Sequence, residues 1–390
     1  AIQRELWSPE KVMIGSKCPL GMLRLHPECL EVEIPVRTGA VDPYQAYVIT
    51  DWYLENCTFN DADKNMWVLG LNLPSDSVMI GMTALLSGCF DEGAHILSSY
   101  AGTAYKANRF GDGYFLDSYQ NPQRVGCGVA AATCQGAWGR ALVEGLFGVE
   151  PHLDENYVTV RPNFPRSWKK ASFERPALSI SFDGTDPSGV WKITTASHVA
   201  ARLQLPVFSP VESLRVNGRD AAVVIEPGIG CGRLTVNAPP GGAEMRLNHG
   251  AATYTIRALT TNSVQIGGCC EIAYSGLDEI APDDRFGFFS DVRARNGRVS
   301  MKLAKTGCGR ATMFLNCRSG SLRWIQPVGF DTDNGIHLVQ TVTDSLPSGS
   351  KLVPVDLGAV YNENINTCFD HRWDWDHCAF FPYPELISTN

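Results

Sequence analysis

The sequence predicts an α+β multidomain protein in which helical hairpins are followed by a β-sandwich and a further β-rich region. Apolar residues recur at three- and four-residue steps over the first part of the chain, and short alternating segments recur about every ten residues after it. The two patterns meet within residues 135–168. We therefore predict a helical region over residues 1–152, a β-sandwich over 153–250 and a β-rich region over 251–390.

Residues 135–168 are expected to join helix to strand. A helical repeat runs to Phe147, and Gly148 and Pro151 then stop it, because glycine readily follows a last helical turn and proline cannot continue one. From Tyr157 onward the hydrophobic period changes to two, which predicts a strand.

Three helices are expected upstream of this junction. Asp42 is an expected N-cap with Pro43 at the first helical position, a second helix follows a cap at Ser75 and Asp76, and a third begins at Asp91. Helices joined by short turns indicate hairpins that pack side by side.

The β regions are predicted from short alternating segments. In the sandwich these are residues 178–182, 190–194, 201–205, 213–216 and 233–236, with a hairpin turn at Asn217-Gly218. In the C-terminal region they are residues 254–257, 264–266, 299–303, 311–315 and 336–340.

Composition excludes several classes of function. A net charge of -8 and a pI near 5.5 provide no basic face for nucleic acid, and no apolar run reaches the roughly 18 to 20 residues that cross a bilayer. The 13 cysteines contain no C-x-x-C pair, which argues against zinc-ribbon and thioredoxin-like sites. Residues 371–377, with the sequence HRWDWDH, place His and Asp on opposite faces of a strand, so an aromatic face is favoured over a metal site. The glycines of residues 228–232 lack a nucleotide-site context and indicate a turn. We predict no metal and no cofactor.

Two segments resemble a known family. Residues 140–148 read RALVEGLFG and residues 158–168 read VTVRPNFPRSW, and this order after helical hairpins resembles the six-hairpin glycosidases, most closely a bacterial glycosidase-like branch. The resemblance implies a partial (α/α) toroid followed by a C-terminal β-sandwich and a polysaccharide-derived glycan as substrate. It implies an extracytoplasmic location, with the cytoplasm as the alternative. It also implies that the chain is a C-terminal fragment holding the later toroid helices.

The sequence departs from that family where its acids are expected. Two carboxylates precede the arginine of the family motif, and the matching positions here hold Ala130 and Thr133. A second family position, an Ala-Glu pair, falls near Asp76 and Ser77. Two hypotheses therefore stay open: a glycoside hydrolase, and a non-catalytic homologue that binds sugar or serves as a scaffold.

A glycosidase needs two carboxyl groups, roughly 5 Å apart for retention and about 6.5 to 9.5 Å apart for inversion. The candidate catalytic acids are Asp117, Asp112 and Asp76, and Asp42 is a candidate sugar ligand. Asp42 and Asp76 are equally explained as N-caps, and Asp112 and Asp117 as residues of a glycine-containing turn.

Aromatic rings could supply a sugar platform, because pyranose rings have apolar faces. Trp67, Tyr114 and Trp138 are the candidates, with core packing as the alternative, and Trp67 falls where the family has a loop tryptophan. Glu144 is expected to pair with Arg140 at the i, i+4 spacing. The predicted partner is a carbohydrate, with neither nucleic acid nor membrane, and the sequence leaves the oligomeric state open.

Overall fold

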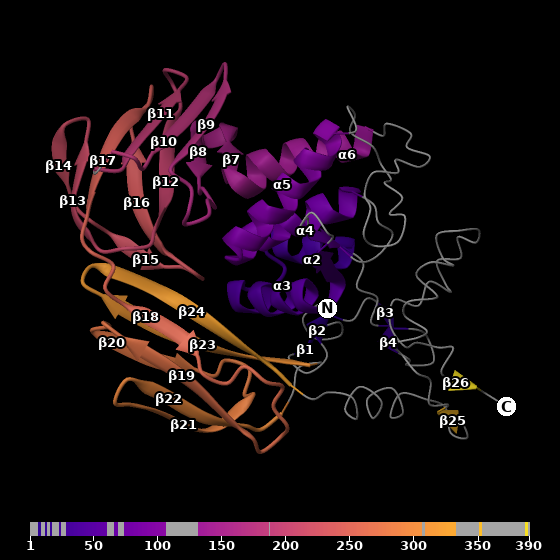
Figure 1. Ribbon diagram of the computed structural model, residues 1–390. Helices are drawn as coiled ribbons and strands as arrows, with labels where there is room; N and C mark the ends of the chain where they lie inside the picture. The colour runs from indigo at the N-terminus through magenta and orange to yellow at the C-terminus, as the bar shows by residue number, and fades with distance from the viewer. Residues whose placement is uncertain are drawn as a thin grey trace.

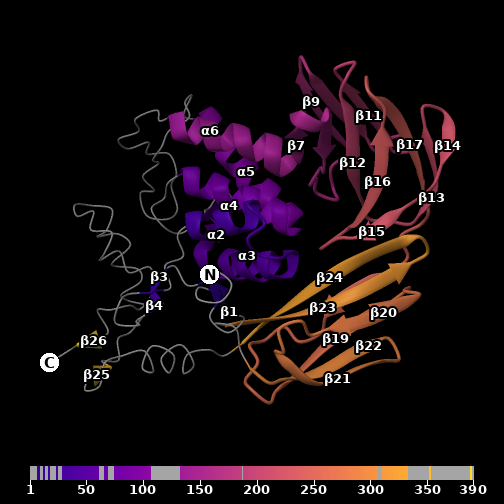
Figure 2. The same cartoon turned by 180° about the vertical axis from the view of Figure 1, so that it is seen from behind.

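The computed structural model describes residues 7–8, 12–13, 16–17, 23–24, 29–60, 66–68, 74–106, 132–186, 188–305, 309–332, 351–352 and 387–388. Within them a helical region lies beside two pairs of sheets (Figure 1), and the reverse view shows the same arrangement (Figure 2). The fold is rich in sheets, and most of them are antiparallel, which agrees with the β-rich part of the predicted fold class.

The helical region contains five α-helices and a π-helix among the described residues. They are α2 (Cys29–Arg37), α3 (Pro43–Cys57), α4 (Pro74–Ser87), α5 (Phe90–Lys106), α6 (Ala132–Arg140) and the π-helix η1 (Ala141–Leu146). The expected cap of α3 is confirmed: the Asp42 carboxylate accepts a hydrogen bond from the Gln45 amide at 2.9 Å, and the Gln45 side chain accepts one from the Asp42 amide at 3.0 Å. The expected cap at Ser75 and Asp76 is wrong, because α4 begins at Pro74 and these residues lie in its first turn. Proline suits the start of a helix, since its missing N–H has no helical partner there.

Helix α4 is the centre of the helical region. It contacts α2, α3, α5, α6 and η1. A helix that is apolar on every side is a buried one, and the side chains of Val78 and Ile80, which lie on opposite sides of α4, are both fully buried. Gly93 allows α5 to approach closely, because a Cβ atom there would lie 2.7 Å from the carbonyl oxygen of Gly81 in α4.

The predicted switch from helix to strand is confirmed within residues 135–168. Helix α6 continues into η1, and β7 (Val149–His152), a short 3-10 helix η2 (Leu153–Glu155) and β8 (Tyr157–Val160) follow. Gly148 has a φ of +60°, and a Cβ atom there would overlap the carbonyl of Arg161. The turn therefore requires glycine for both conformation and space.

The first sheet pair follows this switch. A six-stranded sheet has the order β14-β13-β17-β11-β10-β9, and a five-stranded sheet has the order β15-β16-β12-β8-β7. The further strands are β9 (Lys170–Arg175), β10 (Leu178–Asp183), β11 (Val190–Thr195), β12 (Ala200–Val207), β13 (Val211–Val216), β14 (Arg219–Ala221), β15 (Ile225–Pro227), β16 (Gly232–Ala238) and β17 (Ala243–His249). All pairs are antiparallel except β8 with β12. All five strands predicted between 178 and 236 are present.

The second sheet pair has four and three strands, ordered β18-β19-β22-β21 and β20-β23-β24. The strands are β18 (Thr255–Ala258), β19 (Cys269–Ser275), β20 (Glu279–Asp283), β21 (Phe289–Arg295), β22 (Arg298–Leu303), β23 (Arg310–Ser319) and β24 (Leu322–Asp331). The strand predicted at 264–266 is reduced to a bridge between Val264 and Thr332, and the one predicted at 336–340 lies outside the described residues.

Short two-stranded pairs complete the described elements. They are β1 (Trp7–Ser8) with β2 (Val12–Met13), β3 (Ser16–Lys17) with β4 (Leu23–Arg24), β5 (Thr58–Asn60) with β6 (Met66–Val68), and β25 (Lys351–Leu352) with β26 (Ile387–Ser388).

The second sheet pair contacts the rest of the fold through apolar packing and through a buried ion pair. Ile229, in the turn between β15 and β16, packs with Val48 of α3 and with Phe314 and Ile325. The guanidinium of Arg310 in β23 donates two hydrogen bonds of 3.0 Å to the Asp51 carboxylate of α3, and both side chains are 12% exposed. The same guanidinium donates to Asp331 at 2.6 Å.

Candidate functional site

Five of the predicted site residues have side chains that the structure does not place. Asp112, Tyr114 and Asp117 lie outside the described residues, and so do the side chains of Asp76 in α4 and Trp67 in β6. Their assignment to a sugar site stays a prediction.

The other two predicted site residues have structural contacts. Asp42 is exposed and its carboxylate caps α3. Trp138 of α6 is half-buried and packs on Tyr100 of α5, with ring centroids 5.4 Å apart. Neither contact tests the role in sugar binding that we predicted for these residues.

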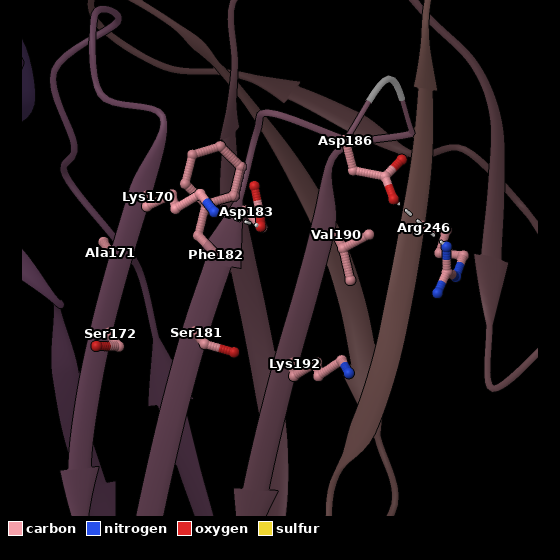
Figure 3. A pocket seen from close by; sticks show the side chains of 10 residues that line it. All are labelled: Lys170, Ala171, Ser172, Ser181, Phe182, Asp183, Asp186, Val190, Lys192 and Arg246. Carbon is pink, nitrogen blue, oxygen red and sulfur yellow. Dashed lines mark ion pairs between the residues drawn. The ribbon is translucent and has the colours of Figure 1, made fainter.

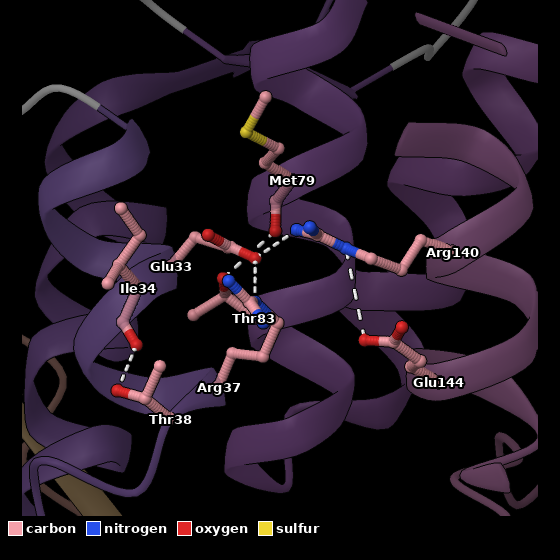
Figure 4. Close-up of polar contacts among 8 residues, drawn as sticks. All are labelled: Glu33, Ile34, Arg37, Thr38, Met79, Thr83, Arg140 and Glu144. Atoms are coloured by element: carbon pink, nitrogen blue, oxygen red, sulfur yellow. Dashed lines mark hydrogen bonds and ion pairs between the residues drawn. The ribbon is translucent and has the colours of Figure 1, made fainter. Parts of the chain in front are cut away.

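A polar cluster links α2 to α6 and η1 (Figure 4). Glu33 of α2 is 1% exposed, and one of its carboxylate oxygens accepts hydrogen bonds from Arg37, at 2.6 Å, and from Arg140. Arg140 also lies 3.9 Å from Glu144, so the expected i, i+4 pair is present. Both Glu33 and Glu144 thus contact one guanidinium, which places the two carboxylates within about 10 Å of each other.

The surroundings of Glu33 do not suit proton transfer to a sugar. A general acid must reach the leaving oxygen of the sugar, whereas the Glu33 carboxylate is buried and accepts hydrogen bonds from two guanidinium groups. We interpret this cluster as an ion-paired contact that fixes α2 against α6. Within the described helices, Glu33 and Glu144 therefore do not form a catalytic acid–base pair.

A groove lies on the outer face of the six-stranded sheet (Figure 3). Its volume is about 620 Å³, within the range of ligand sites. It is lined by residues of four neighbouring strands and of the turn between β10 and β11: Lys170, Ala171, Ser172, Ser181, Phe182, Asp183, Asp186, Val190, Lys192 and Arg246. We call it the sheet groove.

The strand register arranges the outward side chains of the sheet groove, together with the adjoining Glu244, in two rows. Successive side chains of a strand point to opposite faces, so residues paired across strands share a face. The first row is Lys170, Asp183, Val190 and Arg246, and the second is Ser172, Ser181, Lys192 and Glu244. Each row crosses β9, β10, β11 and β17 in that order.

Ion pairs hold the charged side chains of these rows. Lys170 lies 3.2 Å from Asp183, Lys192 lies 3.2 Å from Glu244, and Arg246 contacts Glu244 at 2.9 Å and Asp186 at 3.7 Å. All of these side chains are at least a third exposed, so the pairs add little stability but orient donors and acceptors toward solvent.

Hydrogen bonds keep the groove carboxylates ionised. The Thr185 hydroxyl and amide donate to Asp183, and together with Lys170 they lower the pKa of Asp183 to about 2. Ser188 lowers the pKa of Asp186, and Lys192 with Arg246 lowers that of Glu244. The groove therefore keeps both carboxylate acceptors and cationic donors across the neutral and mildly acidic pH range.

The sheet groove is not among the sites that the sequence predicts. Its strands β10 and β11 were predicted, and the alternation in β10 places Ser179 and Ser181 on the face opposite Ile180. However, which strands are neighbours is set by pairing between β11 and β17, which lie about fifty residues apart in the chain. Alternation alone does not specify that pairing.

The described residues also bear on metal binding, on the cysteines and on membrane spans. The described residues bring together no group of three His, Cys, Asp or Glu side chains that could hold a metal ion, and residues 371–377 lie outside them. Cys89, Cys231, Cys269, Cys270 and Cys317 carry free thiols. None of the helices in the described part of the chain is long and apolar enough to cross a membrane.

Comparisons with known proteins include distant neighbours among the solved structures. No family model matches the chain, and no curated protein matches it in sequence. One solved structure, a GH127 β-L-arabinofuranosidase from Geobacillus stearothermophilus, is similar with 10% identity and a TM-score of 0.27, over 77% of this chain and 59% of that one. A polysaccharide lyase is similar with 9% identity and a TM-score of 0.22, over 47% of this chain and 38% of that one. The chain thus spans less than two thirds of either neighbour, and neither likeness assigns a family.

Proposed function

We propose that the protein binds carbohydrate and that the sheet groove is its binding site. The observation that carries the proposal is the pair of side-chain rows across β9, β10, β11 and β17. A sugar presents many hydroxyl groups, each of which both donates and accepts hydrogen bonds. The groove offers donors from Lys170, Lys192 and Arg246, acceptors from three carboxylates, and serine hydroxyls that do both.

The rigidity of the sheet favours this use. Groups placed on paired strands and oriented by ion pairs lose little freedom when a ligand binds, and hydrogen bonds from charged groups are stronger than neutral ones. The acidic net charge of the whole chain and the balanced charge of the groove both argue against a nucleic-acid ligand.

Calorimetric titration with a panel of oligosaccharides tests the proposal. We expect saturable binding to at least one glycan and an affinity at least about tenfold lower in Lys192→Met, which removes a central donor. Lys302→Met is the matched control, because Lys302 lies on β22 of the second sheet pair, is half exposed and pairs with Asp291 at 2.9 Å. Equal affinity in Lys192→Met and the control, or no binding to any glycan, would refute the proposed site.

Hydrolysis of a polysaccharide-derived glycan is the second candidate function. It is supported by the order of helices α2 to α6, η1 and the sheets, which is the order expected of a partial α/α toroid followed by a β-sandwich. In this proposal Asp112, Asp117 and Asp76 supply the acids, with Trp67, Tyr114, Trp138 and Asp42 binding the sugar. An extracytoplasmic location belongs to the same proposal, and cell fractionation tests it.

Asp117→Asn and Asp112→Asn test the hydrolase directly. We expect either change to lower the rate of glycan hydrolysis by at least about 100-fold, because proton transfer by a positioned group contributes that much or more. Asp154→Asn is the control for this assay, since Asp154 is an exposed aspartate of η2 that belongs to neither proposed site. If the native protein releases no reducing ends from glycans that it binds, the non-catalytic alternative holds.

A further inference from the structure

We infer that the sheet groove selects a linear, uncharged glycan that lies across the strands and contacts both ends of the two side-chain rows. The inference rests on the proposed function and adds the class of ligand and its direction. Three features of the groove carry it: the span of the rows, the pairing of every charge, and the apolar position within the first row.

The rows set the direction and the minimum length of the ligand. Each row has one side chain on each of four neighbouring strands, from β9 to β17. Strands lie about 4.8 Å apart, so a row spans roughly 14 Å perpendicular to the strands. A single sugar ring is shorter than this span and reaches only part of it. A chain of several units can contact Lys170 at one end and Arg246 at the other.

Every cation of the groove is already paired with a carboxylate, so an acidic sugar finds no unpaired cation to bind there. Lys170 is paired with Asp183, Lys192 with Glu244, and Arg246 with both Glu244 and Asp186. Three cations and three carboxylates therefore balance. A uronate would have to displace one of these carboxylates and leave it beside another negative charge, which is unfavourable. Hydroxyl groups, by contrast, can bind the outer faces of the pairs without breaking them.

Val190 provides an apolar contact within the polar rows. It lies between Asp183 and Arg246 in the first row, is 8% exposed and lines the groove. The C–H face of a sugar ring can pack there while its hydroxyl groups point toward the charged neighbours. Figure 3 shows Val190 between these side chains, on the strand that also carries Lys192.

The inference is tested by titrating the intact protein with neutral oligosaccharides of increasing length and with uronate oligosaccharides of matched length. We expect affinity to rise with each added unit until the span is filled and then to stay constant, and uronate chains to bind at least about tenfold more weakly. Affinity that does not depend on length, or uronate binding that equals neutral binding, would overturn the inference.

Asp183→Asn gives a second and independent readout. It removes the carboxylate that pairs with Lys170, so the freed ammonium should raise the affinity for uronate chains, relative to that for neutral chains, by about fivefold or more. Asp291→Asn is the matched control: it frees Lys302 on the second sheet pair, away from the groove, and should change neither affinity. No increase in Asp183→Asn would contradict the role of charge pairing.

The outcomes separate the two proposals. If no saccharide binds, the proposed function fails and the inference fails with it. If saccharides bind with a loss in Lys192→Met but without selection against uronates, the proposed function holds and only the inference fails.

Discussion

Replacing Arg310 by methionine should separate the helical region from the second sheet pair in a pH-dependent way. Arg310 is the cation between Asp51 of α3 and Asp331 of β24, with two hydrogen bonds of 3.0 Å to the first and one of 2.6 Å to the second. Removing one partner of a buried ion pair costs about 3 to 5 kcal/mol, because the other charge is left without compensation. Arg310 and Asp51 are 12% exposed, so we expect the lower end, about 3 kcal/mol.

The pH dependence follows from the pKa of Asp51. Burial raises this pKa from 3.8 to about 6, and Arg310 opposes the rise. The folded protein therefore binds this proton more tightly than the unfolded chain does. The stability that proton binding to Asp51 contributes is fully present below pH 3.8 and is lost as pH rises through about 6. Without Arg310 the pKa of Asp51 rises further, so the protein continues to lose stability up to a higher pH. The penalty of Arg310→Met should therefore be larger at about pH 8 than at about pH 5, by roughly 1.4 kcal/mol for each pKa unit of additional rise.

Urea unfolding at the two pH values measures this difference. Arg295→Met is the control, because Arg295 is an exposed arginine in the same sheet pair. Adding Asp51→Asn to Arg310→Met should recover part of the loss at the higher pH, since the uncompensated charge is then absent. A penalty equal at both pH values, or no larger than that of Arg295→Met, would refute this reasoning.

Three further changes test the helical region by thermal or urea unfolding. Asp42→Ala should lose about 1 kcal/mol, because it removes the side-chain half of the capping box; a loss below a few tenths would contradict the cap. Gly136→Ala should gain up to roughly 1 kcal/mol, since a Cβ atom at this α6 position meets nothing within 4 Å, and destabilisation would count against the described packing. Glu33→Gln should lose about 2 kcal/mol by weakening hydrogen bonds from two guanidinium groups, whereas Glu144→Gln, which changes a half-exposed carboxylate, should lose much less.

Local signals made part of this fold predictable. Asp42 with Pro43 and Gln45 forms a capping box within four residues, and Gly148 is needed at a turn between adjacent elements. Both depend on interactions close in the sequence, so the residues themselves specify the structure. The strands β10, β11 and β12 alternate clearly because one face of each packs into the core of the first sheet pair.

Other elements could not be read from local patterns. Strand β20 contains Pro282 and β24 contains Pro327, and proline within a run argues against a strand. The structure accommodates them because β20 and β24 are the outer strands of their three-stranded sheet, where a missing N–H need not break a ladder.

The candidate site was less predictable than the fold. The sheet groove depends on the register of β9, β10, β11 and β17, and the Asp51–Arg310 pair joins residues 259 positions apart. Such pairings arise only when the tertiary structure forms. The acids proposed for hydrolysis, Asp112 and Asp117, lie outside the described residues, so the prediction made for them awaits the activity assay.

The central position of α4 has a consequence for how the protein assembles. Val78, Met82 and Leu85 of α4 belong to a core that continues through η1 into the first sheet pair, and Ile80 belongs to a second cluster with α2 and α3. A helix with no solvated face gains little from forming before its neighbours are in place. The helical region and the first sheet pair should therefore open and close as one cooperative unit. Amide hydrogens of α4 should exchange with solvent only when both come apart together, and residues 29–148 without the sheets should not reach the native fold.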